Sequence, residues 1–125
     1  MFNSIRRFIT KQRLIGRLNR IKASVDNVME YEDYGAKDFR AIKADAKWPQ
    51  YGNCAVYAAS YQARLDEVGI KGHIYYGIHK ARGAHAVVLV PSEFGPYVMD
   101  NFGRSVWPYD SRDWALFYMW TGEVK

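Results

Sequence analysis

The chain has 125 residues, of which 49% are hydrophobic and 16% aromatic, so it can bury one compact core and is not a disordered chain. It contains no apolar run of the ~18–20 residues that a membrane span needs, and we expect neither a transmembrane segment nor a secretory signal. The net charge is +5, and the single Cys excludes an internal disulfide and favours a reducing, cytoplasmic location.

The basic residues are concentrated near the N-terminus. Seven of the 18 Lys and Arg residues lie in residues 1–22, and no acidic residue precedes Asp26. Apolar residues recur there at steps of three and four, which predicts a basic amphipathic helix over residues 1–30. Such a helix either covers the core with its basic face in solvent or contacts a polyanion non-specifically, either nucleic acid or an anionic membrane. Residues 31–125 are expected to complete the same compact domain.

The remaining elements predict an α+β fold. A short helix is expected within residues 38–46. Asn53 is a good N-cap for a helix that begins at Cys54 and reaches Val68, with Gly69 as its C-terminal cap. Apolar runs separated by turn residues then predict an antiparallel meander, and an aromatic run predicts a final helix over residues 113–120. The strands of the meander are expected at residues 73–78, 84–90, 97–102 and 106–108.

The residue types at three element ends are those of a catalytic triad. Cys54 would stand at a helix N-terminus, which favours its thiolate, and the thiolate is the nucleophilic form. His85, near the start of a strand, would exchange the proton, and Asp100, at the end of another, would hold the imidazole in the correct tautomer. His79 and His73, on the neighbouring strand, are alternatives to His85. A buried structural Cys is the simpler alternative for Cys54.

Further residues are candidates for the walls of such a site. The backbone N–H of Cys54 and the side chain of Gln50 could form an oxyanion hole. Trp48 and Tyr51 could line the substrate pocket, as could Asn101, which is also an alternative to Asp100. The sequence has no paired C-x-x-C or H-x-x-x-H spacing, and it has no glycine-rich phosphate loop, so we expect neither a metal nor a cofactor.

These motifs resemble those of the transglutaminase-like superfamily over roughly residues 48–108. The segment YGNCAVYAA is similar to its nucleophile motif, and HAVVLV and YVMDNFG are similar to its His and Asp strands. Bacterial transglutaminase-like cysteine peptidases have Gly-Asp-Cys, His-Ala-Val and Leu-Asp-Asn at these places. Asn53 departs from the usual Asp or Gln, and Ala55 and Val56 replace an acidic pair. The resemblance implies a papain-like core in which Cys54, His85 and Asp100 form the triad.

The resemblance implies a cysteine hydrolase of bacterial or phage type, a peptidase or amidase that acts on a protein or peptide through a thioester on Cys54. The same fold could instead support an acyltransferase, a transglutaminase or a deamidase. A different class of function also stays open. In that alternative, the domain is a non-catalytic binding module that presents its basic helix to nucleic acid or to an anionic membrane.

Overall fold

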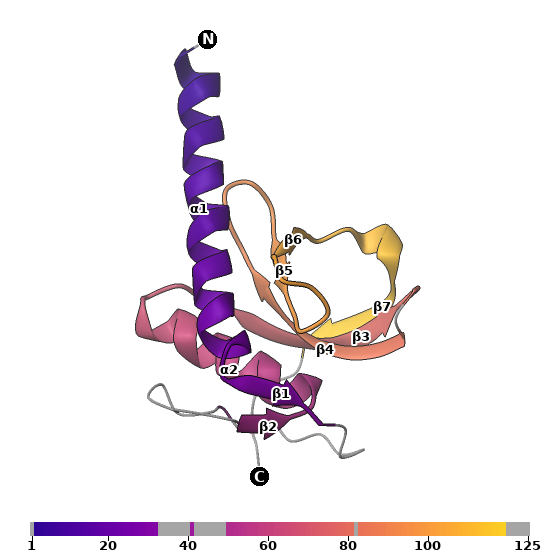
Figure 1. Ribbon diagram of the computed structural model, residues 1–125. Helices are drawn as coiled ribbons and strands as arrows, with labels where there is room; N and C mark the ends of the chain where they lie inside the picture. The colour runs from indigo at the N-terminus through magenta and orange to yellow at the C-terminus, as the bar shows by residue number, and fades with distance from the viewer. Residues whose placement is uncertain (1, 33–40, 42–49, 82, 120–125) are drawn as a thin grey trace.

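The computed structural model describes residues 2–32, 41, 50–81 and 83–119. One long helix packs against a second helix, and the second helix packs on an antiparallel sheet (Figure 1). A separate pair of short strands lies beside the second helix. The predicted α+β class, with a helix carrying Cys54 packed on an antiparallel sheet, is confirmed.

Helix α1 spans Phe2–Asp26 and belongs to the core only through its C-terminal half. Leu18 and Val25 are buried there, whereas the N-terminal turns rise beyond the rest of the molecule (Figure 1). The helix ends before residue 30, because residues 29–31 form strand β1 (Met29–Tyr31) instead. Strand β1 pairs in parallel with β2 (Gln50–Gly52), a pairing that the sequence pattern did not indicate.

Helix α2 spans Cys54–Glu67 and carries most of the buried side chains of the helical layer. Small and aromatic residues dominate its sequence, and Ala58, Tyr61 and Leu65 recur on its buried face. Gly69 follows the helix with a φ of 76°, the left-handed conformation that a C-terminal glycine cap adopts at little cost. The helix packs on the central strand of the sheet and against α1.

In the part of the chain that the structure describes, the sheet has five strands in the order β6-β5-β4-β3-β7, and all neighbouring strands are antiparallel. Strand β4 is apolar over most of its length and largely buried, as expected for a central strand covered on both faces. The bounds of the strands are β3 His73–His79, β4 Gly83–Val90, β5 Tyr97–Met99, β6 Trp107–Pro108 and β7 Trp114–Met119.

The prediction of a final helix over residues 113–120 is wrong. A short 3-10 turn at Ser111–Asp113 leads into strand β7, which pairs with β3. A short apolar run does not distinguish a buried helix from a strand, and the open edge of β3 offers backbone partners that favour the strand. The short helix expected within residues 38–46 lies outside the described residues, apart from Ala41, which is not helical.

Candidate active site

Cys54 is the first residue of α2 and is partly exposed. The side-chain oxygen of Asn53 accepts hydrogen bonds from the backbone N–H groups of Ala55, at 3.1 Å, and Val56, at 3.3 Å. This N-cap satisfies two of the amides that a helix start leaves without partners. The thiol therefore lies at the positive end of the helix dipole, where a negative charge is favoured.

Replacing Asn53 by Ala is expected to lower the free energy of unfolding by about 1 kcal/mol, because both capping hydrogen bonds are lost. Urea denaturation followed by circular dichroism measures this change. Asn53→Ser is the matched control, since a serine hydroxyl caps as well as an amide. Equal losses of stability in both variants would contradict the capping role.

His85 lies on β4, Asp100 directly follows the neighbouring strand β5, and both are buried. In the pairing of β4 with β5, Val88 lies opposite Met99, so a continued register would place Asp100 opposite Val87, diagonally from His85. The Nε2 atom of His85 lies 3.4 Å from Oδ2 of Asp100. At this distance the pair does not form a hydrogen bond of good geometry, and neither atom has a hydrogen-bond partner among the described residues. Resting catalytic sites are often loose in this way.

Electrostatics couple Cys54 to His85. Burial raises the pKa of the Cys54 thiol, but the hydrogen bond to His85 and the amides of Ala86 and Ala55 outweigh it, so the net pKa is lowered. Burial lowers the pKa of His85, but its interactions with Asp100 and Cys54 outweigh that effect and raise the net pKa. Both shifts favour the ion pair of thiolate and imidazolium, which is the reactive form of a catalytic cysteine.

The two alternative histidines have other surroundings. The Nδ1 atom of His79 accepts a hydrogen bond from Ala81 N–H at 3.1 Å, and its ring packs against Trp107 and Trp114, with ring centroids 5.7 Å and 5.0 Å away. His73 is exposed at the start of β3. His85 is thus the histidine that the described structure brings to Cys54 and Asp100.

Phe102 belongs to the site, although the sequence pattern did not single it out. Its ring stacks on the imidazole of His85, with centroids 3.8 Å apart and planes 20° from parallel. Its backbone N–H donates to Oδ1 of Asp100 at 3.2 Å. The phenyl ring covers one face of the imidazole and restricts its rotation. The signal was available, because Phe102 lies within the same YVMDNFG segment as Asp100.

A buried polar cluster joins α1 to the site. Lys22, which is fully buried, binds the Asp26 carboxylate and lies 3.3 Å from the Tyr61 hydroxyl. The Tyr61 hydroxyl donates to Asp26 and lies 3.3 Å from the backbone carbonyl oxygen of Asp100. Burial, with the Asp26 charge as a second cause, raises the pKa of Tyr61, so this hydroxyl keeps its proton. Lys22 therefore belongs to the core rather than to the solvated basic face of α1.

The weaker candidates lie on two segments. Gln50 is the first residue of β2, where its backbone N–H donates to the Val28 carbonyl at 2.8 Å, and Tyr51, next to it, is 42% exposed. Asn101 follows Asp100, and its Oδ1 is buried without a hydrogen-bond partner among the described residues. Trp48 lies outside the described residues. The roles expected for these four residues stay predictions.

Within the described ranges, no group of three or more His, Cys, Asp or Glu side chains is arranged to hold a metal ion. The chemistry that the site residues offer is that of a thiol, an imidazole and a carboxylate.

The helix that begins at Cys54 and the antiparallel sheet that holds His85 and Asp100 form a transglutaminase-like α+β fold. Solved structures of LapG from Legionella pneumophila share it. The calcium-bound LapG structure matches with a TM-score of 0.64 and 21% identity over 83% of this chain and 63% of that chain. Another LapG structure gives a TM-score of 0.61 and 20% identity over 85% of this chain and 63% of that chain.

The chain thus spans 63% of the LapG chain, and at this identity the likeness establishes the fold alone. No protein-family model matches the sequence, and no curated protein matches it either.

Proposed function

We propose that the protein is a cysteine hydrolase, a peptidase or amidase in which Cys54, His85 and Asp100 form the catalytic triad. One observation carries the proposal: the buried imidazole of His85 lies 3.4 Å from the carboxylate after β5, and its interaction with the thiol at the start of α2 lowers the pKa of that thiol. A structural cysteine would gain nothing from this arrangement, whereas a nucleophile needs a base and the base needs a group that orients it.

In the first step, the Cys54 thiolate attacks the carbonyl carbon of an amide or ester and forms the S–C bond. The oxygen becomes an oxyanion, which backbone amides can stabilise; the N–H of Cys54, at the first turn of α2, is one candidate donor. As the C–N or C–O bond breaks, the imidazolium of His85 gives its proton to the leaving group. The product is a thioester on Cys54 with neutral His85.

In the second step, neutral His85 takes a proton from water, and the water oxygen attacks the thioester carbonyl. The S–C bond then breaks, the acid leaves, and Cys54 returns as a thiolate beside imidazolium. The negative charge of Asp100 stabilises the imidazolium in both steps. An amine in place of water would give acyl transfer, and a glutamine side chain as substrate would give deamidation.

The fold supports a peptide or protein as the substrate class, because LapG is a transglutaminase-like cysteine protease.

An activated p-nitrophenyl ester tests the mechanism. We expect a burst of about one equivalent of p-nitrophenolate and a thioester on Cys54 visible by mass spectrometry, followed by slower turnover. Cys54→Ala should abolish the burst, and Asp100→Asn should slow it about 10²-fold or more, because the imidazolium loses its counter-charge. Asp66→Asn, an exposed carboxylate at the end of α2, is the matched control and should leave the burst unchanged.

Added methylamine separates the two acyl fates, since an amide product identifies a transferase and an acid product identifies a hydrolase. Two results together would contradict an enzymatic function. If Cys54 reacts at the rate of a simple thiol, and if Asp100→Asn and Asp66→Asn behave alike, the domain is a binding module.

A further inference from the structure

The outward side of the N-terminal half of α1 exposes large apolar side chains. Ile5, Phe8 and Ile9 are 53%, 62% and 42% exposed. At 100° per residue, these three side chains form a stripe on a side of the helix different from the one that buries Leu18 and Val25. We name these three residues the outer stripe. Exposure of this much apolar surface at adjacent positions indicates a contact surface.

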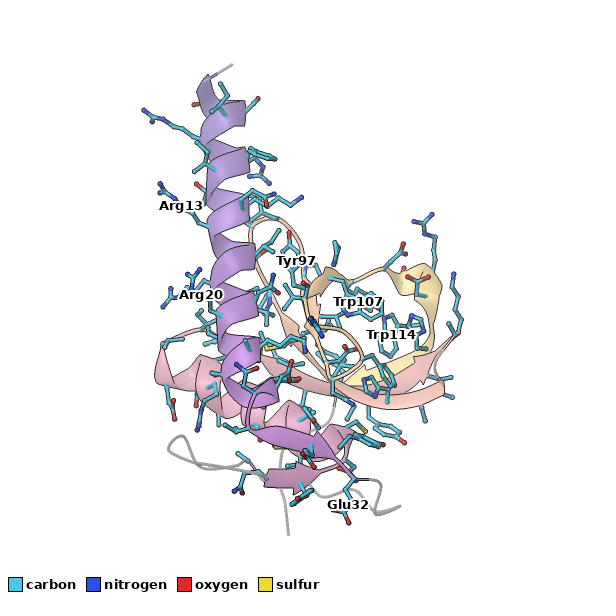
Figure 2. The ribbon with its side chains drawn as sticks, in the orientation of Figure 1. Arg13, Arg20, Glu32, Tyr97, Trp107 and Trp114 are labelled. Atoms are coloured by element: carbon cyan, nitrogen blue, oxygen red, sulfur yellow. The ribbon has the colours of Figure 1, made fainter. Side chains whose placement is uncertain are left out.

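Basic side chains border the outer stripe. A shallow hollow on α1 is lined by Phe8 and Ile9 from the stripe, by Gln12 and Gly16, and by Arg13 and Arg20. Figure 2 shows Arg13 and Arg20 on the same side of α1, pointing away from the sheet. Among the described residues, the ion pairs of this helix involve only Arg7, at 3.8 Å from Glu93, and the buried Lys22. The surface thus combines apolar groups with positive charges that have no ionic partner in the described part of the chain.

Three kinds of partner could bind a surface of apolar side chains and arginines. A second copy of the helix would cover the outer stripe but would bring the same arginines together, which is unfavourable. Nucleic acid would neutralise the arginines through its phosphates but would leave Ile5 and Phe8 in water. An anionic lipid surface accounts for both, because apolar side chains enter the boundary of the acyl chains while arginines meet the phosphates.

We propose that the outer stripe and the arginines beside it dock α1 in the plane of an anionic lipid bilayer. The helix lies on the surface and does not cross it: within the described residues, no helix is long and apolar enough to span a bilayer. The N-terminal turns of α1, which carry the outer stripe, rise beyond the rest of the molecule, whereas lower on the helix Arg20 lies beside the C-terminal end of α2 (Figure 1). The proposal does not depend on the chemistry of Cys54.

Co-sedimentation of the full chain with vesicles tests the proposal. We expect binding to vesicles that mix phosphatidylglycerol with phosphatidylcholine, and binding at least about tenfold weaker to phosphatidylcholine alone. Raising the salt to about 0.5 M should weaken binding to the anionic vesicles, because it shortens the screening length. The double variant Ile5→Ser, Phe8→Ser should bind about tenfold more weakly even at low salt, since it loses the apolar contact.

Ile78→Ser is the matched control, because Ile78 is 43% exposed on β3, away from α1. It should bind vesicles as the unchanged protein does. The alkylation rate of Cys54 and the thermal melt report folding in every variant, so a loss of binding is separated from a loss of the domain.

Several results would overturn the proposal. Binding that is equal with and without phosphatidylglycerol, or equal in the two serine variants, excludes docking through this surface. Tight binding of duplex DNA that survives Ile5→Ser, Phe8→Ser, with no binding to vesicles, assigns the arginines to nucleic acid. A dimer at micromolar concentration that the same variant dissociates assigns the outer stripe to a second copy.

Discussion

Replacing His85 by Ala is expected to shift the reaction of Cys54 with iodoacetamide to higher pH. The thiol pKa lies below its ordinary value because the hydrogen bond to His85 and the nearby amides outweigh burial. Without His85, burial and the remaining amides act alone, and the pKa moves back up. A thiol at about 8.5 is only a few per cent ionised at neutral pH. Because a more basic thiolate is also more nucleophilic, we expect a net fall in rate of about tenfold at pH 7.

The pH dependence of alkylation and of ester turnover tests the direction of the pKa shifts of Cys54 and His85. The lowered Cys54 pKa should move the acidic limb of the unchanged protein below that of a simple thiol, and the raised His85 pKa should extend the imidazolium form to higher pH. Ester turnover, which needs both groups, should therefore follow a bell between the two limbs. The measurement is clean because Cys54 is the single Cys of the chain.

His73→Ala is the control for this experiment, since His73 is exposed at the start of β3. It should leave the alkylation profile unchanged. Superimposable profiles for the unchanged protein and His85→Ala would end the proposed partnership between His85 and Cys54.

A methyl group added at Gly52 is expected to lower the free energy of unfolding by about 1–3 kcal/mol. A Cβ atom there would lie 2.4 Å from Cβ of Val56 and 2.6 Å from its Cγ1, and Val56 is fully buried in the first turn of α2. Real Cβ atoms do not approach so closely, so β2 or the helix must move. Because Asn53 and Cys54 follow Gly52 directly, Gly52→Ala should also slow the alkylation of Cys54.

Gly103→Ala supplies the comparison, because its Cβ atom would meet nothing closer than the Ser105 carbonyl oxygen at 3.8 Å. Exposed substitutions of this kind change stability by about 0.5 kcal/mol or less. The midpoints of urea denaturation of the two variants measure this difference in stability. If Gly52→Ala is as stable as Gly103→Ala, β2 does not press on α2 as described.

Local chemistry made α2 the most predictable element. Its cap, its buried stripe and its terminal glycine all lie within the helix and its flanks, so the predicted span from Cys54 to Val68 nearly equals the observed span to Glu67. Strand β7 was not predictable in the same way. Its apolar residues suit a buried helix or a strand, and the choice depends on the open edge of β3, which lies far away in sequence.

The candidate site, too, was predictable where local sequence decides and not where distant contacts decide. Cys54, His85 and Asp100 could be chosen from the sequence, because a helix start and two strand ends carry recognisable residue types. The surroundings of those residues could not. The stacking of Phe102 on His85 depends on the turn after β5, and the burial of Lys22 depends on how α1 packs against Tyr61. Sequence periodicity placed Lys22 with the basic face because periodicity does not report ion pairs made in the core.

The order of synthesis adds a consequence for α1. The side chain of Asn19 accepts a hydrogen bond of 2.7 Å from the Val106 amide, a contact that joins positions 87 residues apart. On the ribosome, α1 emerges long before this partner, and its buried residues, Leu18 and Val25 among them, stay exposed to solvent until α2, against which α1 packs, has been made. A nascent chain that stops short of α2 would therefore present an amphipathic helix with an uncovered apolar face, and such a segment tends to aggregate or to bind chaperones.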